Sequence, residues 1–376
     1  MLSLYALFDV DFPVDNKVIL KAMILYMLSV ITPFHFQQNG RGSLDSAVKR
    51  LEACLQSLFI AGDLDILIPT NQRNLLTGRF DAQILEDSQP FPIYSPGLAR
   101  CHGIEHSAAC TLFIMDADLI CSTQLAEQLP TRSVQLVREG FEMYPCLYLT
   151  KEETERFDGD FQGCLESFLR GENHRVEGIA LASSCLLMNR EWFLQLGGFD
   201  EQFVGHGGED LELIDRLTRH YPIGPRPDDY ALNIKAQHPG DYQGFRRYFS
   251  YYALPHLFAG RFLVHQWHPR PLTHPYHKRR ANNDQLLEQM LARSEAERGP
   301  LKGPVVPCND LNGELPDFRE WMICVQEEAG YPVSEYPGLL RWQDGITLRR
   351  PLWRKVRKLY LNPRAFFRDM FKPTSR

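Results

Sequence analysis

Short apolar segments alternate with a helical segment near the start of the chain. Residues 26–38 have the pattern of a buried strand that ends in a loop at Pro33, and residues 43–62 have helical apolar spacing. Residues 64–70 and 110–121 are further apolar strands. Strands separated by helices predict an α/β sandwich with a mostly parallel central sheet, in which ligands bind at the carboxyl ends of the strands.

The length of the chain predicts more than one compact unit. Its 376 residues exceed the size of a typical single core. The amino-acid composition changes after residue 220, where aromatic residues and histidine become frequent. Pro and Gly interrupt the later sequence. We expect four segments: an N-terminal extension (1–25), a main α/β domain (26–285), a helical or irregular extension (286–348) and a basic tail (349–376).

Charge divides the chain unequally. The net charge is -6, but residues 349–376 hold ten Arg or Lys and one Asp, so the tail carries +9 and the remainder -15. An acidic body argues against nucleic-acid binding. The tail also places apolar residues such as Trp353 and Tyr360 at helical spacing between its basic residues. This make-up predicts that the tail lies on an anionic membrane surface, or else docks on the acidic body.

The cysteines and the first residues of the chain indicate the cellular compartment of the protein. The nine cysteines form an odd set with no CxxC pair, which fits neither a disulfide framework nor a zinc site. The first residues lack a basic secretory signal, and the longest early apolar run, residues 22–31, is too short to span a bilayer. We expect a cytoplasmic protein, peripheral on the inner face of the membrane.

Two aspartates follow the apolar run of residues 112–115. Asp116 and Asp118 are expected to emerge where a central strand meets its loop, on one side of the chain. Two carboxylates at this spacing can share a divalent cation such as Mg²⁺ or Mn²⁺. The alternative is a polar turn that only closes the strand.

A glycine-rich segment precedes a second acidic pair. Gly205 to Gly208, interrupted by His206, permit a backbone turn that residues with a Cβ atom avoid. Glu209 and Asp210 are expected to begin a helix, whose N-terminus favours ionised carboxylates and keeps their pKa low. A carboxylate so placed could accept a proton from an attacking hydroxyl, or both acids could serve as helix caps.

Residues 263–270, LVHQWHPR, form a further apolar strand that ends in polar groups. His265 and His268 flank Trp267 there. A neutral imidazole is a good ligand for a Mn²⁺-like ion that carboxylates already hold.

Three ordered blocks carry a resemblance to known enzymes. GLARCHGIEHSAACTLFIMDADL (97–119) resembles the metal-binding region of family 2 glycosyltransferases. LASSCLLMNREWFLQLGGFDEQFVGHGGEDLELIDRL (181–217) resembles the acceptor-site block of β-1,4-galactosyltransferases, polypeptide N-acetylgalactosaminyltransferases and chondroitin-synthase-like capsule polymerases. VHQWHP…Y…R…N (264–283) resembles a chondroitin-synthase-type segment with a metal-binding histidine, which is His265 or His268. The resemblance covers roughly residues 28–285.

The resemblance implies a metal-dependent glycosyltransferase of GT-A fold with a C-terminal helical extension. Such an enzyme would move a hexose or N-acetylhexosamine from a UDP-sugar to a hydroxyl of a bacterial surface glycan, of capsule or lipopolysaccharide type, with inversion. Asp116 and Asp118 would hold Mn²⁺ or Mg²⁺. Asp210 would be the catalytic base, and Glu209 would hold the acceptor.

Two further residues are candidates for binding the donor. Arg100 could pair with the donor phosphates, or with Glu105 on its own helix. Trp267 is the first choice for stacking on a sugar ring, and core packing is the alternative. The other aromatic candidates are Trp192, Phe199 and Phe203. Two other functions stay open for the chain: a nucleotidyltransferase, or an inactive glycan-binding scaffold.

Overall fold

The computed structural model describes residues 28–37, 42–62, 64–90, 92–136, 140–234, 236–270, 274–293, 297, 315–346, 356, 359, 360, 363, 366 and 367. The expected N-terminal extension lies outside these ranges, as does most of the basic tail. Within the ranges, every helix is too short or too polar to cross a membrane.

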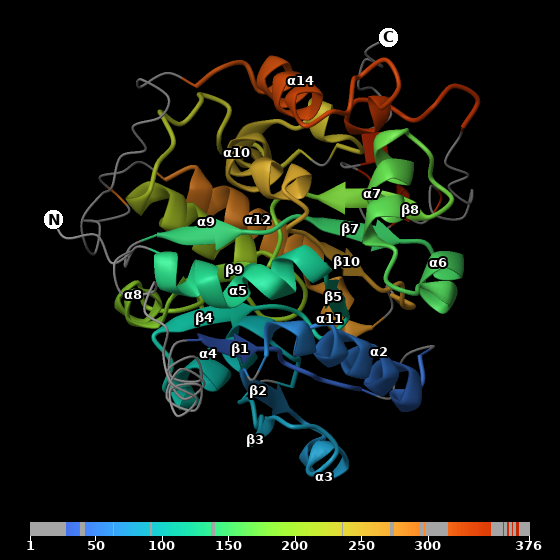
Figure 1. Ribbon diagram of the computed structural model, residues 1–376. Helices are drawn as coiled ribbons and strands as arrows, with labels where there is room; N and C mark the ends of the chain where they lie inside the picture. The colour runs from blue at the N-terminus through green and yellow to red at the C-terminus, as the bar shows by residue number, and fades with distance from the viewer. Residues whose placement is uncertain are drawn as a thin grey trace, which may run out of the picture.

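The larger of two sheets has six strands in the order β3-β2-β1-β4-β9-β6, and Figure 1 shows its central strands side by side. The strands are β1 (Leu28–Ile31), β2 (Asp65–Thr70), β3 (Gln83–Glu86), β4 (Thr111–Ile114), β6 (Phe141–Met143) and β9 (Leu186–Asn189). The four strands from β3 to β4 are parallel, and β9 runs antiparallel to both β4 and β6. The prediction of a mostly parallel central sheet is confirmed.

The second sheet has four strands in the order β5-β10-β7-β8. They are β5 (Leu119–Cys121), β7 (Cys146–Leu149), β8 (Val176–Ala180) and β10 (Leu263–His265). The strand predicted over 110–121 stops before Asp116, as its apolar run indicates, and the last residues of that range form a separate strand, β5, in the other sheet. The amide of Leu119 donates to the carbonyl oxygen of Asp116 at 3.1 Å, which closes a turn between the two sheets.

The helices lie around both sheets (Figure 1). They are α2 (Leu44–Gln56), α3 (Arg73–Leu76), α4 (Pro96–His106), α5 (Thr123–Gln135), α6 (Lys151–Arg156), α7 (Phe161–Leu169), α8 (Arg190–Gln195), α9 (Glu209–His220), α10 (Gly244–Phe258), α11 (Pro275–Lys278), α12 (Arg280–Leu291) and α14 (Phe318–Glu328). The helix predicted over 43–62 begins after the Ser43 cap, ends at Gln56 and is followed by a 3₁₀ turn, Phe59–Ala61.

Alternate side chains of β4 and of Met115, which follows it, point into two cores. Leu112 and Ile114 pack into a core shared with α9 and α10, while Phe113 and Met115 pack into a core shared with α2 and α5. All four side chains are fully buried. Burial on both faces explains why this strand is continuously apolar instead of alternating with polar residues.

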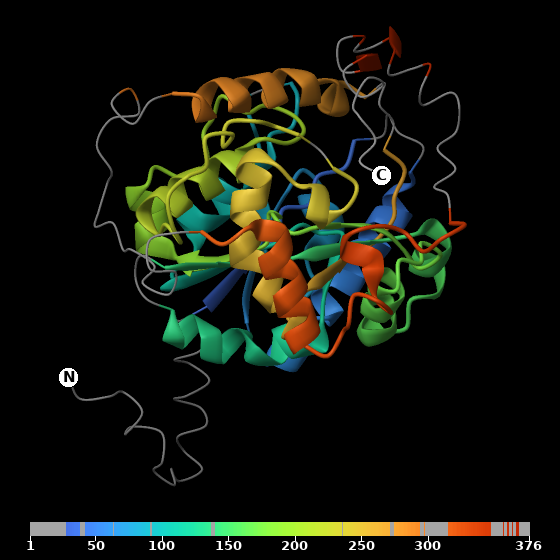
Figure 2. The same ribbon diagram turned by 90° about the horizontal axis from the view of Figure 1, so that it is seen from above.

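The described part of the C-terminal extension packs against the main domain. Figure 2 shows α14 beside α10. The Tyr251 ring lies 5.1 Å from the Phe318 ring, and the Tyr251 hydroxyl donates to the carbonyl oxygen of Pro316 at 2.6 Å. Phe318 and Met322 belong to the same core as α9 and α10, so α14 completes that core.

Candidate functional site

One cavity of about 730 Å³ brings together most of the residues that the sequence singles out. It lies at the turn between β4 and β5, beside the N-terminus of α9. The predicted residues that line it are Arg100, Asp116, Asp118, Glu209, Asp210, His265 and His268. Both acidic pairs therefore face one space, which is large enough for a small-molecule substrate.

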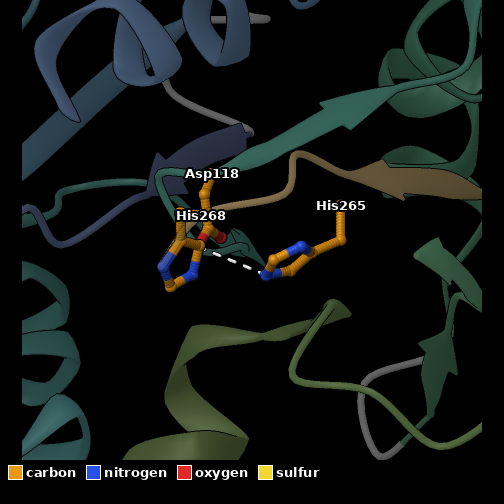
Figure 3. A group of neighbouring side chains, drawn as sticks. All are labelled: Asp118, His265 and His268. Atoms are coloured by element: carbon orange, nitrogen blue, oxygen red, sulfur yellow. Dashed lines mark ion pairs between the residues drawn. The ribbon is translucent and has the colours of Figure 1, made fainter. Parts of the chain in front are cut away.

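Asp118, His265 and His268 form a compact cluster (Figure 3). The Asp118 Oδ2 atom lies 3.3 Å from His265 Nε2 and 3.0 Å from His268 Nε2, and the three possible ligand atoms lie within 4.8 Å of one another. Burial opposes ionisation of Asp118, but the charges and hydrogen bonds of both histidines hold its pKa well below the usual value. One carboxylate and two imidazoles fit a divalent cation such as Mn²⁺.

His265 presents one ring nitrogen to this cluster. A terminal nitrogen of Arg270 lies 2.6 Å from His265 Nε2. The same Nε2 atom faces Asp118, so it is the His265 atom that is available to a cation held there. An unprotonated imidazole nitrogen is the form that ligates a metal.

Arg100 connects the two acidic pairs. Its side chain is buried, with Nη2 2.5 Å from Asp116 Oδ1 and Nη1 3.1 Å from Glu209 Oε1. The second Asp116 oxygen accepts from the Ser184 hydroxyl at 2.8 Å. The alternative pairing of Arg100 with Glu105 is therefore wrong. Asp116 also stands apart from the Asp118–His265–His268 cluster, although the sequence predicts that the two aspartates share a cation.

Glu209 differs from the sequence expectation. Burial, together with the charge of Asp210, raises the pKa of Glu209 to about 7, although Arg100 and the backbone at the start of α9 favour its ionised form. The expectation of a low pKa is wrong for this residue, because desolvation outweighs the helix N-terminus. Its Oε2 atom is buried and accepts no hydrogen bond in the described part of the chain.

Asp210 is half-buried and lines the cavity in the first turn of α9. Its Oδ1 atom accepts from the Leu211 amide at 2.9 Å. The expected helix start at Glu209 is confirmed. Leu213, Ile214 and Leu217 form the apolar face of this helix and are buried.

The glycine-rich turn supports both acids. Gly205, Gly207 and Gly208 have φ angles of 85°, 81° and 108°, which only glycine adopts readily. A Cβ atom on Gly207 would overlap the Arg280 guanidinium. The amide of His206 donates to the carbonyl oxygen of Tyr276 at 3.0 Å. The segment from α11 to α12 therefore packs directly on this turn.

The aromatic candidates do not line the cavity. Trp192, Phe199 and Phe203 are core residues. Trp267 is half-buried and lies outside the cavity, with the ammonium group of Lys151 6.0 Å from the centre of its ring. The aromatic lining consists of other residues, which sequence reasoning missed: Phe34, Phe36, Tyr94, Tyr148 and Tyr276, with His35 stacked on Tyr94 at 4.1 Å.

Sequence reasoning also missed polar lining residues. Ser184 and Arg280 lie within two of the three blocks that carry the resemblance, so those blocks contained the signal. Arg246 lies in the aromatic-rich α10, where the sequence gives no sign of its role.

Comparisons with known proteins agree with this fold. Residues 77–292 match the family described as Glycosyltransferase like family 2. A search of curated proteins finds no match. Solved structures that match this chain include two with less than 20% sequence identity to it.

A mutant Drosophila β-1,4-galactosyltransferase 7 in complex with manganese, UDP-Gal and xylobiose is 15% identical, with a TM-score of 0.27, and the match covers 50% of this chain and 60% of that one. S. aureus TarS is 11% identical, with a TM-score of 0.30, and the match covers 49% of this chain and 32% of that one. The chain thus spans less than two thirds of either protein. Because the family match extends over more than half of the chain, this protein belongs to the family 2-like glycosyltransferases of GT-A fold.

Proposed function

We propose that the protein transfers a sugar from a UDP-sugar to a hydroxyl of a bacterial surface glycan, in a metal-dependent reaction that inverts the anomeric centre. One observation carries this proposal: the Asp118–His265–His268 cluster and Asp210 line the same cavity. An inverting transfer needs a cation at the leaving group and a base at the attacking hydroxyl, on opposite sides of the reacting carbon.

The Asp118–His265–His268 cluster would hold the cation. A bound divalent ion would neutralise the charge that develops on the leaving diphosphate. Two arginines of the cavity suit the diphosphate oxygens: Arg270 contacts His265, and the charge of Asp118 acts on the Arg50 side chain.

Asp210 would act as the base. A carboxylate that lines the cavity can accept the proton of the acceptor hydroxyl as that oxygen attacks. The start of α9 stabilises the negative charge that Asp210 needs for this role. Attack on the side opposite the leaving diphosphate inverts the anomeric configuration.

Arg100 and Glu209 would position the reacting groups. Arg100 holds Asp116 with one terminal nitrogen and Glu209 with the other. The free Oε2 atom of Glu209 can accept a hydrogen bond from a second acceptor hydroxyl. This contact would orient the attacking hydroxyl toward Asp210.

The basic tail would attach the enzyme to the membrane where its acceptor is assembled. This part of the proposal is supported by the composition of residues 349–376, most of which lie outside the described residues. Liposomes that contain anionic lipid should float the full chain but not a chain that ends at residue 348. Equal flotation of both proteins would rule out the anchor.

A donor screen tests the central proposal. The full chain is incubated with Mn²⁺, a mixture of glycan acceptors and each of a panel of UDP-sugars, and UDP release is followed with and without a chelator. We expect release from one donor or a few donors, and loss of release with the chelator. Release that the chelator leaves unchanged, or no release from any donor, would contradict the mechanism.

A further inference from the structure

Arg246 in α10 lines the cavity without a carboxylate partner. Its Nε and Nη2 atoms donate to the Asn233 Oδ1 atom at 3.2 and 3.0 Å. Asn233 is a neutral amide, and no described carboxylate forms an ion pair with Arg246. A guanidinium stays charged at neutral pH, so this part of the cavity wall carries a positive charge that Asp210 and Asp284 offset only from a distance.

Arg280 in α12 adds a second guanidinium to the same wall. Its Nε atom donates to Asp284 at 2.9 Å, and its terminal nitrogens lie against the Gly207 backbone. Burial, together with the charge of Arg280, lowers the pKa of Arg246, and the charges of Asp284 and Asp210 only partly oppose this. The two arginines therefore lie close to each other and to the proposed base.

Two like charges in a partly buried wall repel each other. An anion between them would relieve this repulsion, and guanidinium groups bind carboxylate or phosphate oxygens in bidentate fashion. The donor diphosphate is already accounted for by Arg50, Arg270 and the Asp118–His265–His268 cluster. The remaining pair lies on the side of Asp210 and the glycine-rich turn, where the acceptor hydroxyl must lie.

We propose that Arg246 and Arg280 bind a carboxylate or phosphate substituent of the acceptor, so that the acceptor of this enzyme is an acidic glycan. This inference rests on the proposed function, because it assumes that the acceptor sugar occupies the space beside Asp210. It adds the chemical class of the acceptor to that function.

Binding measurements test the inference without requiring catalysis. The probes are tetrasaccharides that contain glucuronate, galacturonate or a sugar phosphate, each paired with its carboxyl-reduced or dephosphorylated counterpart. Calorimetric titration compares the full chain with R246Q, R280Q and R247Q variants. Arg247 is the matched control, since it is the next residue of α10, pairs with Asp229 and does not line the cavity.

At least one acidic probe should bind the full chain about tenfold more tightly than its neutral counterpart. R246Q and R280Q should each remove most of this preference, and R247Q should keep it. Mn²⁺ binding by all three variants checks that the cavity is intact. The inference is overturned if no acidic probe is preferred, or if R246Q and R280Q keep the preference.

The same variants test whether Arg246 and Arg280 bind the acceptor or the donor sugar. UDP-glucuronate and UDP-glucose are titrated in parallel, because an acidic donor sugar offers the same carboxylate. A preference for UDP-glucuronate that R246Q abolishes would move the arginine pair to the donor and overturn the assignment. UDP release in the donor screen is an independent readout, so failure of the proposed function can be told apart from failure of this inference.

Discussion

Two pairs of carboxylates line the cavity, Asp116 with Asp118 and Glu209 with Asp210, and Arg100 contacts one member of each. Asp116 and Glu209 are the tied members. Asp118 instead contacts two histidines, and Asp210 has no ion-pair partner among the described residues. The comparison shows that Arg100 binds one acid of each pair and leaves the other to different contacts.

The largest expected effect comes from the free member of the second pair. Replacing Asp210 by Asn removes the proton acceptor and should lower the transfer rate by about 10²- to 10⁴-fold. Donor binding should be unchanged, because Asp210 is separate from the Asp118–His265–His268 cluster. UDP release at saturating donor measures the rate, with D344N, a change at an exposed aspartate, as the control. A fully active D210N enzyme would remove Asp210 as the base.

Removing the arginine tests whether the two tied acids depend on it. Arg100→Gln should lower the free energy of unfolding by about 3 kcal/mol, because it leaves Glu209 buried without its partner. Most of the cost comes from Glu209, since the Asp116 side chain is 40% exposed and water screens its charge. Urea unfolding measures the change, and R319Q on the exposed side of α14 is the control. Equal stability of R100Q and the unaltered chain would show that Asp116 and Glu209 do not depend on Arg100.

The two members of the first pair, Asp116 and Asp118, should differ in their effect on metal binding. Asp118→Asn should weaken Mn²⁺ binding by about ten- to hundredfold, whereas Asp116→Asn should weaken it less, because Asp116 is held by Arg100 and Ser184. Calorimetric titration of Mn²⁺ into each variant gives the ratio. Equal losses in the two variants would show that both aspartates share the cation, as the sequence spacing suggests.

The smallest expected effect concerns the pH dependence of stability. With a pKa of about 7 in the folded protein and 4.5 in the unfolded chain, Glu209 binds more protons when folded between these pH values. The free energy of unfolding should therefore fall as pH rises from 4.5 to 7. Glu209→Gln should flatten this slope by about 1–3 kcal/mol across the window.

Urea titrations at several pH values measure the slope, with Glu155→Gln at an exposed site as the control. If the E209Q protein and the unaltered chain show the same slope, the carboxyl group of Glu209 ionises in the folded state much as it does in water.

Much of the fold follows from local sequence patterns. The strands β1, β2 and β4, the helix α2 and the start of α9 lie where apolar periodicity and glycine signals place them. The strand expected over 110–121 ends before the aspartates as predicted, but Leu119–Cys121 form a second strand that the sequence did not assign to another sheet. Periodicity cannot show that the turn between them moves the chain to another sheet.

Candidate residues that belong to short motifs come together in one cavity. Asp118, Asp210, His265 and His268 belong to such motifs, and all four line the cavity. The partners of Arg100 were not predictable, because Asp116 and Glu209 lie far apart in sequence. Its place between His265 and His268 makes Trp267 a candidate stacking surface, yet its ring lies outside the cavity and near the ammonium group of Lys151.

The turn between β4 and β5 links hydrogen bonds of both sheets. The amide of Met115 donates to Ile31 in the large sheet at 3.1 Å, and the carbonyl oxygen of Asp118 accepts from the amide of Gln266, which follows β10 of the small sheet, at 2.9 Å. A ligand held at Asp118 therefore restrains both sheets at their junction. Binding of a ligand there should therefore stabilise the junction of the two sheets. We expect an occupied site to reduce local opening of the small sheet.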